Sequence, residues 1–191
     1  MEERYVLRNA RHLAADYMMR TIRQGDAVVD ATMGNGKDTL FLCELVGETG
    51  HVYAFDVQRK AVERTRERVK EAGFEARTTL LLAGHETMDE HIKEPVQAVM
   101  FNLGWLPGAE HIVTTQTETT LRAVQAALDL IAPGGIVTVC VYPGHEEGTR
   151  ELEALKKYVS GLSVRMYNVL YHCFVNASSQ TPQLFLIRKN K

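Results

Sequence analysis

Short apolar runs alternate with longer amphipathic segments along this 191-residue chain, and this alternation limits the fold more than any other feature. The apolar runs predict strands at residues 27–31, 52–55, 78–82, 96–101, 136–142, 163–171 and 183–188. The amphipathic segments predict helices at residues 9–23, 37–46, 59–72, 117–131 and 147–158. Strands joined by helices pair in parallel, with helices on both faces of the sheet. We therefore expect an α/β fold, a doubly wound and mostly parallel sheet of about seven strands, whose last two strands form an antiparallel edge hairpin.

The length and composition fit one globular domain spanning residues 1–191, with residues 1–25 forming a helix that packs on it. Hydrophobic residues make up 45% of the chain and charged residues 24%, which argues against a disordered or collagen-like protein. The three cysteines are far apart, so we expect no metal site. No run reaches the ~20 apolar residues of a membrane span, and no signal peptide is recognisable. We expect a cytoplasmic protein with no membrane partner.

The loop after the first strand has the features of a nucleotide-cofactor site. Ligands of doubly wound sheets bind beyond the carboxyl ends of the strands. This loop reads Asp-Ala-Thr-Met-Gly-Asn-Gly from Asp30, and glycines at 34 and 36 allow close approach to a ligand. Asp56 ends the second strand, where an acid can accept hydrogen bonds from ribose hydroxyls. The two features predict an adenosine-containing cofactor; a helix-capping turn beside a solvated acid is the alternative.

The same loop favours S-adenosylmethionine (SAM) over a nicotinamide cofactor. The dinucleotide fingerprint G-x-G-x-x-G would place its third glycine at Thr39, where it is missing. Asp38 falls in the first helical turn, where a carboxylate repels a pyrophosphate but suits the ammonium or sulfonium of SAM. Asp30 at the strand end offers a second negative group. A nicotinamide-dependent dehydrogenase is the least favoured alternative.

Three later loops supply further candidates. After the third strand, His85 could contact the adenine, or could serve with Glu86 as a helix cap. After the fourth strand, the loop 102–108 places Asn102 and the only tryptophan, Trp105, at the ligand-binding edge. Amino-group methyltransferases often carry a polar-x-x-aromatic motif here, in which the polar group accepts amine N–H bonds and the ring stacks on the base; a core tryptophan is the alternative.

After the fifth strand, Tyr142 and His145 are candidates for proton transfer. A structural turn with an exposed histidine explains this loop equally well. The methyl transfer itself needs mainly close and aligned reactants.

Three motifs together resemble the MnmM (YtqB-like) family of tRNA 5-aminomethyl-2-thiouridine methyltransferases. They are Asp-Ala-Thr-x-Gly-Asn-Gly-x-Asp-Thr from Asp30, Asn-Leu-Gly-aromatic-Leu-Pro-Gly from Asn102, and Tyr-Pro-Gly-His from Tyr142. The resemblance covers nearly the whole chain and implies a class I, Rossmann-like SAM-dependent methyltransferase. The implied reaction converts 5-aminomethyl-2-thiouridine at wobble position 34 of tRNA to 5-methylaminomethyl-2-thiouridine. A homodimer is a further implication of the resemblance alone.

The predicted site residues follow from the motifs and the resemblance. The predicted cofactor contacts are Asp30, Thr32, Gly34, Asn35, Gly36, Asp38, Asp56, Gln58, His85 and Glu86. The predicted target-amine pocket comprises Asn102, Gly104, Trp105, Pro107, Tyr142 and His145, of which Asn102, Tyr142 and His145 are the catalytic candidates. The chain departs from the family pattern in having Trp105 where tyrosine is more frequent, and Ala-Glu after Pro-Gly, which affects the fit of the base.

The net charge of −2 indicates local rather than broad contacts with RNA. We expect the partner to be the anticodon stem-loop of tRNA, with N-terminal arginines such as Arg8 and Arg11 touching a few phosphates. The basic helix 59–72 also carries glutamates, and we expect it to be a solvated face with i,i+4 ion pairs. The salt dependence of RNA binding should therefore be shallow. The open alternatives are a methyltransferase acting on another amine, in rRNA, a protein or a small molecule, and a catalytically silent RNA-binding module.

Overall fold

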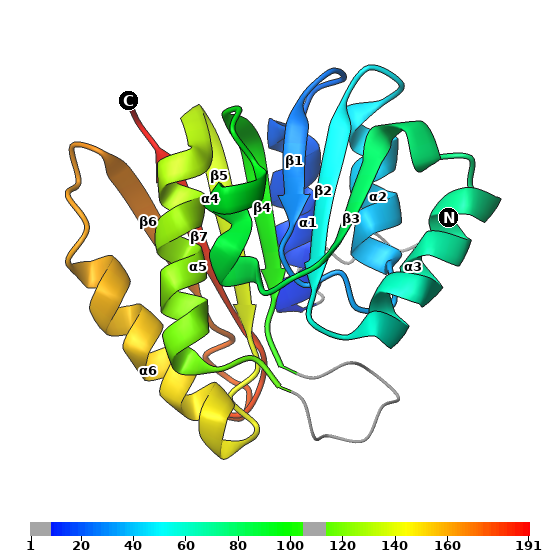
Figure 1. Ribbon diagram of the computed structural model, residues 1–191. Helices are drawn as coiled ribbons and strands as arrows, with labels where there is room; N and C mark the ends of the chain where they lie inside the picture. Colours follow the sequence, from blue (N-terminus) through cyan, green and yellow to red (C-terminus); the bar gives the residue numbers. More distant parts are fainter. Residues whose placement is uncertain (1–8, 105–113) are drawn as a thin grey trace, which may run out of the picture.

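A computed structural model describes residues 9–104 and 114–191, and its elements follow the predicted alternation (Figure 1). The strands are β1 (Ala27–Asp30), β2 (His51–Asp56), β3 (Thr78–Leu82), β4 (Val96–Asn102), β5 (Ile131–Val141), β6 (Tyr167–His172) and β7 (Gln183–Lys189). The α-helices are α1 (Ala10–Thr21), α2 (Lys37–Val46), α3 (Arg59–Glu71), α4 (Met88–His91), α5 (Thr117–Leu130) and α6 (Glu146–Ser160). Short 3-10 helices cover Glu75–Arg77 and His85–Thr87.

The seven strands form one sheet in the order β3-β2-β1-β4-β5-β7-β6. The first five strands are parallel, whereas β7 pairs antiparallel with both β5 and β6. The predicted doubly wound sheet with an antiparallel edge hairpin is therefore confirmed. The connection after β1 leads to β2 on one side, and β4 lies on its other side, so the direction of winding reverses between β1 and β4. Ligands of such sheets bind at this point, beyond the carboxyl ends of the strands.

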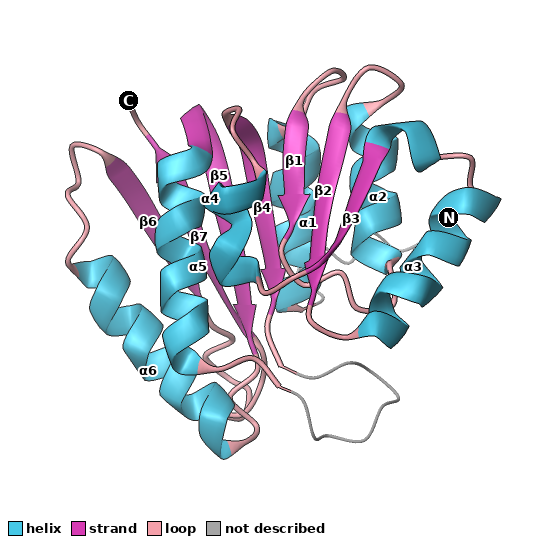
Figure 2. Cartoon of the chain, viewed as in Figure 1, coloured by secondary structure: helices cyan, strands magenta, loops and turns pink. Residues whose placement is uncertain are grey.

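Helices cover both faces of the sheet, as Figure 2 shows. Adjacent residues of a strand point to opposite faces, and accordingly Val28 packs in the core beneath α1 and α2, whereas Val29 packs beneath α5 and α6. Val62 of α3 packs on Ala54, on the same side as α1 and α2. In the described residues, no helix is both long and apolar enough to cross a membrane.

The structure differs from the sequence prediction by more than one residue at two strand boundaries. β5 begins at Ile131, not at 136, and passes through the Pro-Gly-Gly segment with a register shift opposite Val96 and Ala98. Gly134 has a φ of +82°, which a glycine adopts without strain, so the segment is accommodated as a bulge rather than as a loop. β6 begins at Tyr167, not at 163, because residues 163–166 form a turn closed by the Met166 N–H donating to the Ser163 carbonyl.

Candidate active site

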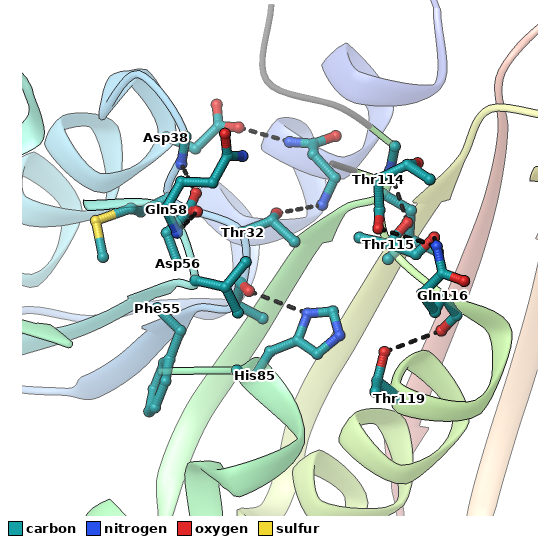
Figure 3. A pocket seen from close by; sticks show the side chains of 18 of the residues that line it. Thr32, Asp38, Phe55, Asp56, Gln58, His85, Thr114, Thr115, Gln116 and Thr119 are labelled. Carbon is teal, nitrogen blue, oxygen red and sulfur yellow. Dashed lines mark hydrogen bonds between the residues drawn. The ribbon is translucent and has the colours of Figure 1, made fainter. Parts of the chain in front are cut away.

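A cavity of about 530 Å³ opens at the carboxyl edge of the sheet, where β1, β2 and β4 end (Figure 3). It is lined by residues from all the predicted loops. The predicted site residues that line it are Arg11, Thr32, Gly34, Asn35, Asp38, Asp56, Gln58, His85, Glu86, Asn102, Gly104 and Tyr142. Asp30, Gly36 and His145 do not line it. Arg8, Trp105 and Pro107 lie outside the described residues.

The glycine loop between β1 and α2 is fixed by its own backbone. Gly34 and Gly36 have φ angles of +49° and +78°, a region that other residues rarely adopt. A Cβ at Gly36 would lie 2.8 Å from Oγ1 of Thr65 in α3. Gly36 is therefore needed for packing the loop against α3, and its contact with a cofactor stays a prediction.

Asp56 ends β2 and faces this loop. Its Oδ2 accepts from the Gly34 N–H at 3.0 Å and its Oδ1 accepts from the Gln58 N–H at 2.8 Å. Burial raises the pKa of its carboxyl above the usual value, while the two backbone bonds oppose that rise. Asp56 therefore connects the loop after β1 to the loop after β2 and still presents its carboxylate to the cavity.

Asp30 ends β1 but is directed into the protein. The Thr39 hydroxyl donates to its Oδ2 at 2.6 Å, and the Thr32 N–H donates to its Oδ1 at 3.2 Å. Burial, and then the charge of Asp38, raise the pKa of Asp30 to about 7. Asp30 therefore holds the loop after β1 and the first turns of α2 in place, and its contact with a cofactor stays a prediction.

Asp38, in the first turn of α2, holds two side chains from distant parts of the chain. Arg11 of α1 donates to its Oδ1 from Nη2 at 2.6 Å and from Nε at 3.2 Å. Asn102, at the end of β4, donates from Nδ2 to its Oδ2 at 2.5 Å (Figure 3). The hydrogen bond with Asp38 raises the pKa of Arg11, although burial opposes this. Arg11 thus neutralises the carboxylate that was expected to face the ammonium or sulfonium of SAM.

The orientation of Asn102 follows from these bonds. Its backbone N–H donates to Thr32 Oγ1 at 2.8 Å, and its Nδ2 is bound by Asp38. Its Oδ1 is buried and has no hydrogen-bond partner among the described residues. A buried acceptor without a donor costs about 1–3 kcal/mol. The side chain therefore offers an acceptor that a ligand N–H or O–H group could satisfy.

Of the two candidates that follow the fifth strand, Tyr142 and His145, only the first lines the cavity. Tyr142 lines the cavity, and burial raises its pKa to about 12, so its phenol is neutral at physiological pH and is a poor base. His145 lies outside the cavity lining and is the N-cap of α6, where its Nδ1 accepts from the Gly148 N–H at 2.7 Å. This cap gives His145 a structural role at the start of α6, and its catalytic role stays a prediction.

His85 is buried in a short 3-10 helix and lines the cavity. Its Nδ1 lies 3.2 Å from the Ala31 carbonyl, which can only accept, so Nδ1 carries the hydrogen. Burial lowers the pKa of His85, and the ring packs edge-on against Phe101 with 5.6 Å between centroids. A neutral imidazole is therefore held at the carboxyl edge by β1 and β4.

Known methylases are similar to this chain in sequence and architecture. The sequence model of the family described as "Putative rRNA methylase" matches residues 52–188. A Clostridium thermocellum crystal structure, described as a "putative rRNA-methylase", is 41% identical, with a TM-score of 0.93 over 95% of this chain and 98% of that one. The chain belongs to this methylase family. Together with the Arabidopsis relative described next, these matches confirm the resemblance to the MnmM family and the Rossmann-like methyltransferase fold.

Two further relatives carry more specific names. An Arabidopsis thaliana protein named tRNA (mnm(5)s(2)U34)-methyltransferase, chloroplastic, is 40% identical over 155 residues, covering 76% of this chain and 57% of the relative. The chain therefore spans little more than half the length of this relative. A Streptococcus mutans crystal structure, described as a "putative methyltransferase" in complex with SAH, is 34% identical, with a TM-score of 0.87 over 95% of this chain and 98% of that one.

In this member of the methylase family, one wall of the cavity was not predicted from the sequence. It is formed by polar residues that precede or begin α5: Thr114, Thr115, Gln116 and Thr119. Thr115 also pairs with Gly104, because the Gly104 N–H donates to its Oγ1 at 2.9 Å and its own N–H donates to the Gly104 carbonyl at 3.1 Å. Nothing in the run of threonines distinguishes a cavity wall from an ordinary helix start, so sequence reasoning had no signal for it.

The burial of Asp30 leads to a pH-dependent stability. Its folded-state pKa of about 7 lies above the ordinary value of 3.8, so the folded protein binds this proton more tightly than the unfolded chain. The stabilisation is present below pH 4 and is lost as the pH rises through about 7. We expect Asp30→Asn to remove up to about 1.4 kcal/mol per pH unit from the slope of unfolding free energy between pH 5 and 7.

Urea denaturation at a series of pH values measures this slope. The exposed Asp89→Asn is the matched control and should keep the wild-type slope. Equal slopes for Asp30→Asn and the wild type would contradict the assignment.

Proposed function

We propose that this protein is a SAM-dependent methyltransferase that converts 5-aminomethyl-2-thiouridine at position 34 of tRNA to 5-methylaminomethyl-2-thiouridine. The observation that carries the proposal is Asn102, which lines the cavity and whose buried Oδ1 has no donor among the described residues. A primary amine supplies the N–H group that this acceptor lacks. The name of the Arabidopsis relative and the SAH bound by the Streptococcus relative support the substrate and the cofactor.

The donor set of the cavity fits SAM. Asp56 presents a carboxylate at the end of β2, where ribose hydroxyls can donate to it. The neutral ring of His85 and the apolar Val57 offer a polar edge and an apolar surface for adenine. Gly34 and Asn35 bring backbone close to the cavity without a bulky side chain between. When bound, SAM supplies an electrophilic methyl group on a sulfonium.

The residues of the chain then act mainly by positioning. Asn102 would accept one N–H of the unprotonated amine at Oδ1 and so direct the nitrogen lone pair toward the methyl group of bound SAM. The methylated amine would leave as an ammonium that loses its extra proton to solvent. Asp38 fixes the orientation of the amide because its carboxylate accepts a hydrogen bond from Nδ2. Arg11 holds Asp38 through two nitrogen donors. Close and aligned reactants account for most of the rate enhancement in such a displacement.

Two alternatives are less well supported. Methylation of an amine in rRNA agrees with the family description, yet the 40% identical Arabidopsis relative is named for tRNA. A catalytically silent RNA-binding module would have no need to hold an unsatisfied acceptor beside a cofactor cavity. The anticodon stem-loop as the recognised part of tRNA, and a homodimeric assembly, stay predictions.

The substrate can be tested directly with purified protein and labelled SAM. We expect methyl transfer to tRNA that carries 5-aminomethyl-2-thiouridine and none to the same tRNA without the aminomethyl group. Nucleoside mass spectrometry of the product identifies the methylated nitrogen. Transfer to both tRNAs, or transfer only to rRNA, would contradict the proposed substrate.

The role of Asp56 can be tested through cofactor affinity. Replacing Asp56 with alanine removes a charged acceptor, and hydrogen bonds to charged groups contribute about 1.5–3 kcal/mol each. We expect Asp56→Ala to weaken SAM binding by about 10- to 100-fold, measured by isothermal titration calorimetry. Asp89→Ala, at an exposed position, is the control. Unchanged affinity in Asp56→Ala would remove this residue from the site.

The role of Arg11 distinguishes positioning from RNA contact. If Arg11 holds Asp38 and Asn102 in place, Arg11→Gln should lower kcat about tenfold or more while the Kd for tRNA stays within about twofold. Arg20→Gln, an exposed arginine of the same helix, should change neither value. If Arg11→Gln instead raises the Kd for tRNA and leaves kcat unchanged, Arg11 contacts phosphate, as the sequence analysis proposed.

A further inference from the structure

Helix α3 carries a row of basic side chains that starts at the rim of the cavity. Lys60, Arg64 and Arg68 are four residues apart, so they lie along one side of the helix over about 12 Å. Lys60 and Arg68 are exposed and Arg64 is half-buried. We call these three residues the α3 row. Figure 1 shows the first turn of α3 at the same edge of the sheet as the cavity.

The basic side chains of α3 do not form the ion pairs that the sequence predicted. Within the described part of the chain, none of them lies within 4.0 Å of a carboxylate oxygen, and the ion pairs found involve only α1, α2 and α6. The expected i,i+4 network on this helix is therefore wrong. The physical reason is that an exposed pair gains at most about 1 kcal/mol and must order two long side chains. The charges of the α3 row are left available to a partner.

The α3 row is continuous with the proposed active site. Arg64 donates from Nη1 to Asn35 Oδ1 at 3.1 Å, and Asn35 lines both the cavity and a surface groove that contains Arg64 and Arg68. Gln58, two residues before Lys60, also lines the cavity. Lys37, an exposed residue of the cavity wall, adds a further positive charge on this side. A polymer with one unit in the cavity could therefore continue directly over α3.

The other sides of the described rim suit an anionic strand less well. Arg11 is bound to Asp38, so its charge is already neutralised. Beside His85 the cavity wall carries the acidic Glu86. Exposed acids also lie in α4 and begin α5 and α6; they are Asp89, Glu90, Glu118 and Glu146, the last paired with Arg150. Arg20 and Arg23 lie near the start of β1, at the edge of the sheet opposite the cavity.

From these charges and this continuity we propose that the α3 row binds phosphates of the RNA strand whose modified nucleotide enters the cavity. The inference rests on the proposed function in that it takes the substrate to be tRNA. The phosphate contacts that the sequence predicted for N-terminal arginines are thereby assigned to Lys60, Arg64 and Arg68 instead. Glu67 and Glu71 line the same groove and limit its positive charge, so few phosphates are held and the salt dependence is shallow.

The test compares two double charge reversals on the same helix. Lys60→Glu with Arg68→Glu changes the α3 row and leaves Arg64 to hold Asn35. Arg66→Glu with Lys70→Glu makes the same change in net charge on the other side of α3, where both residues are exposed. The Kd for tRNA is measured by fluorescence anisotropy at several salt concentrations. The Kd for SAM is measured by calorimetry.

We expect the row variant to bind tRNA at least tenfold more weakly, with the log–log salt slope reduced by about 1.4, since each single-strand phosphate contact contributes about 0.7. The control should lose less than threefold, and both variants should bind SAM like the wild type. Equal losses in the two variants, or no loss in the row variant, would overturn the inference. Wild-type protein that binds no tRNA would overturn it as well. Failure to methylate aminomethyl-tRNA despite tRNA binding would count against the proposed function alone.

Discussion

The carboxylate of Asp38 is the contact on which the geometry of the cavity depends. It joins α1, α2 and β4, three elements that are separated by 27 and 64 residues along the chain. One oxygen binds a guanidinium and the other an amide nitrogen, so each oxygen has a donor of a different kind. The consequence is directional: the bond to Asp38 turns Nδ2 of Asn102 toward α2 and Oδ1 away from it. A single acidic side chain thereby fixes the orientation of the amide.

Two buried polar groups at the carboxyl edge of the sheet lower the stability of the folded protein when no ligand is bound. Asn102 keeps a buried acceptor without a donor, and Asp30 is buried at the end of β1 with a raised pKa. Both features reduce the stability of the folded state, by amounts of order 1–3 kcal/mol for an unsatisfied polar group. A bound amine would satisfy the first of these. The favourable free energy of ligand binding would then come from a hydrogen bond to Oδ1 of Asn102, which has no donor in the described part of the folded protein, rather than from burial of apolar surface.

Much of this arrangement was predictable because strand ends are readable from sequence. Asp56, Asn102 and Tyr142 each follow an apolar run, and the carboxyl ends of parallel strands must meet at one edge. The partner of each side chain was not predictable in the same way. Arg11 was assigned to phosphate on charge alone, because nothing local reveals that Asp38 lies beside it. Pairing between distant elements depends on how helices pack, which periodicity does not specify.

The same limit explains two further differences. His145 precedes a helix, and a side chain in that position can either cap the helix or point outward; only the backbone path decides for capping. The α3 charges alternate in sign, which is typical of an ion-paired face, yet exposed pairs are too weak for spacing alone to fix them. The chemistry of a residue thus predicted well whether it lies at the carboxyl edge of the sheet. It predicted poorly which other residue its side chain binds.

The position of β7 has a consequence for the order in which the sheet can form. β7 lies between β5 and β6 although it follows both in the chain, so β6 has no place in the sheet until β7 has paired with β5. During synthesis the five parallel strands could assemble first, and the apolar β5 would then present an unpaired edge. Unpaired apolar edges are templates for pairing between chains. Until β7 has emerged from the ribosome, aggregation is therefore the competing reaction, and rapid docking of this one strand protects the nascent chain.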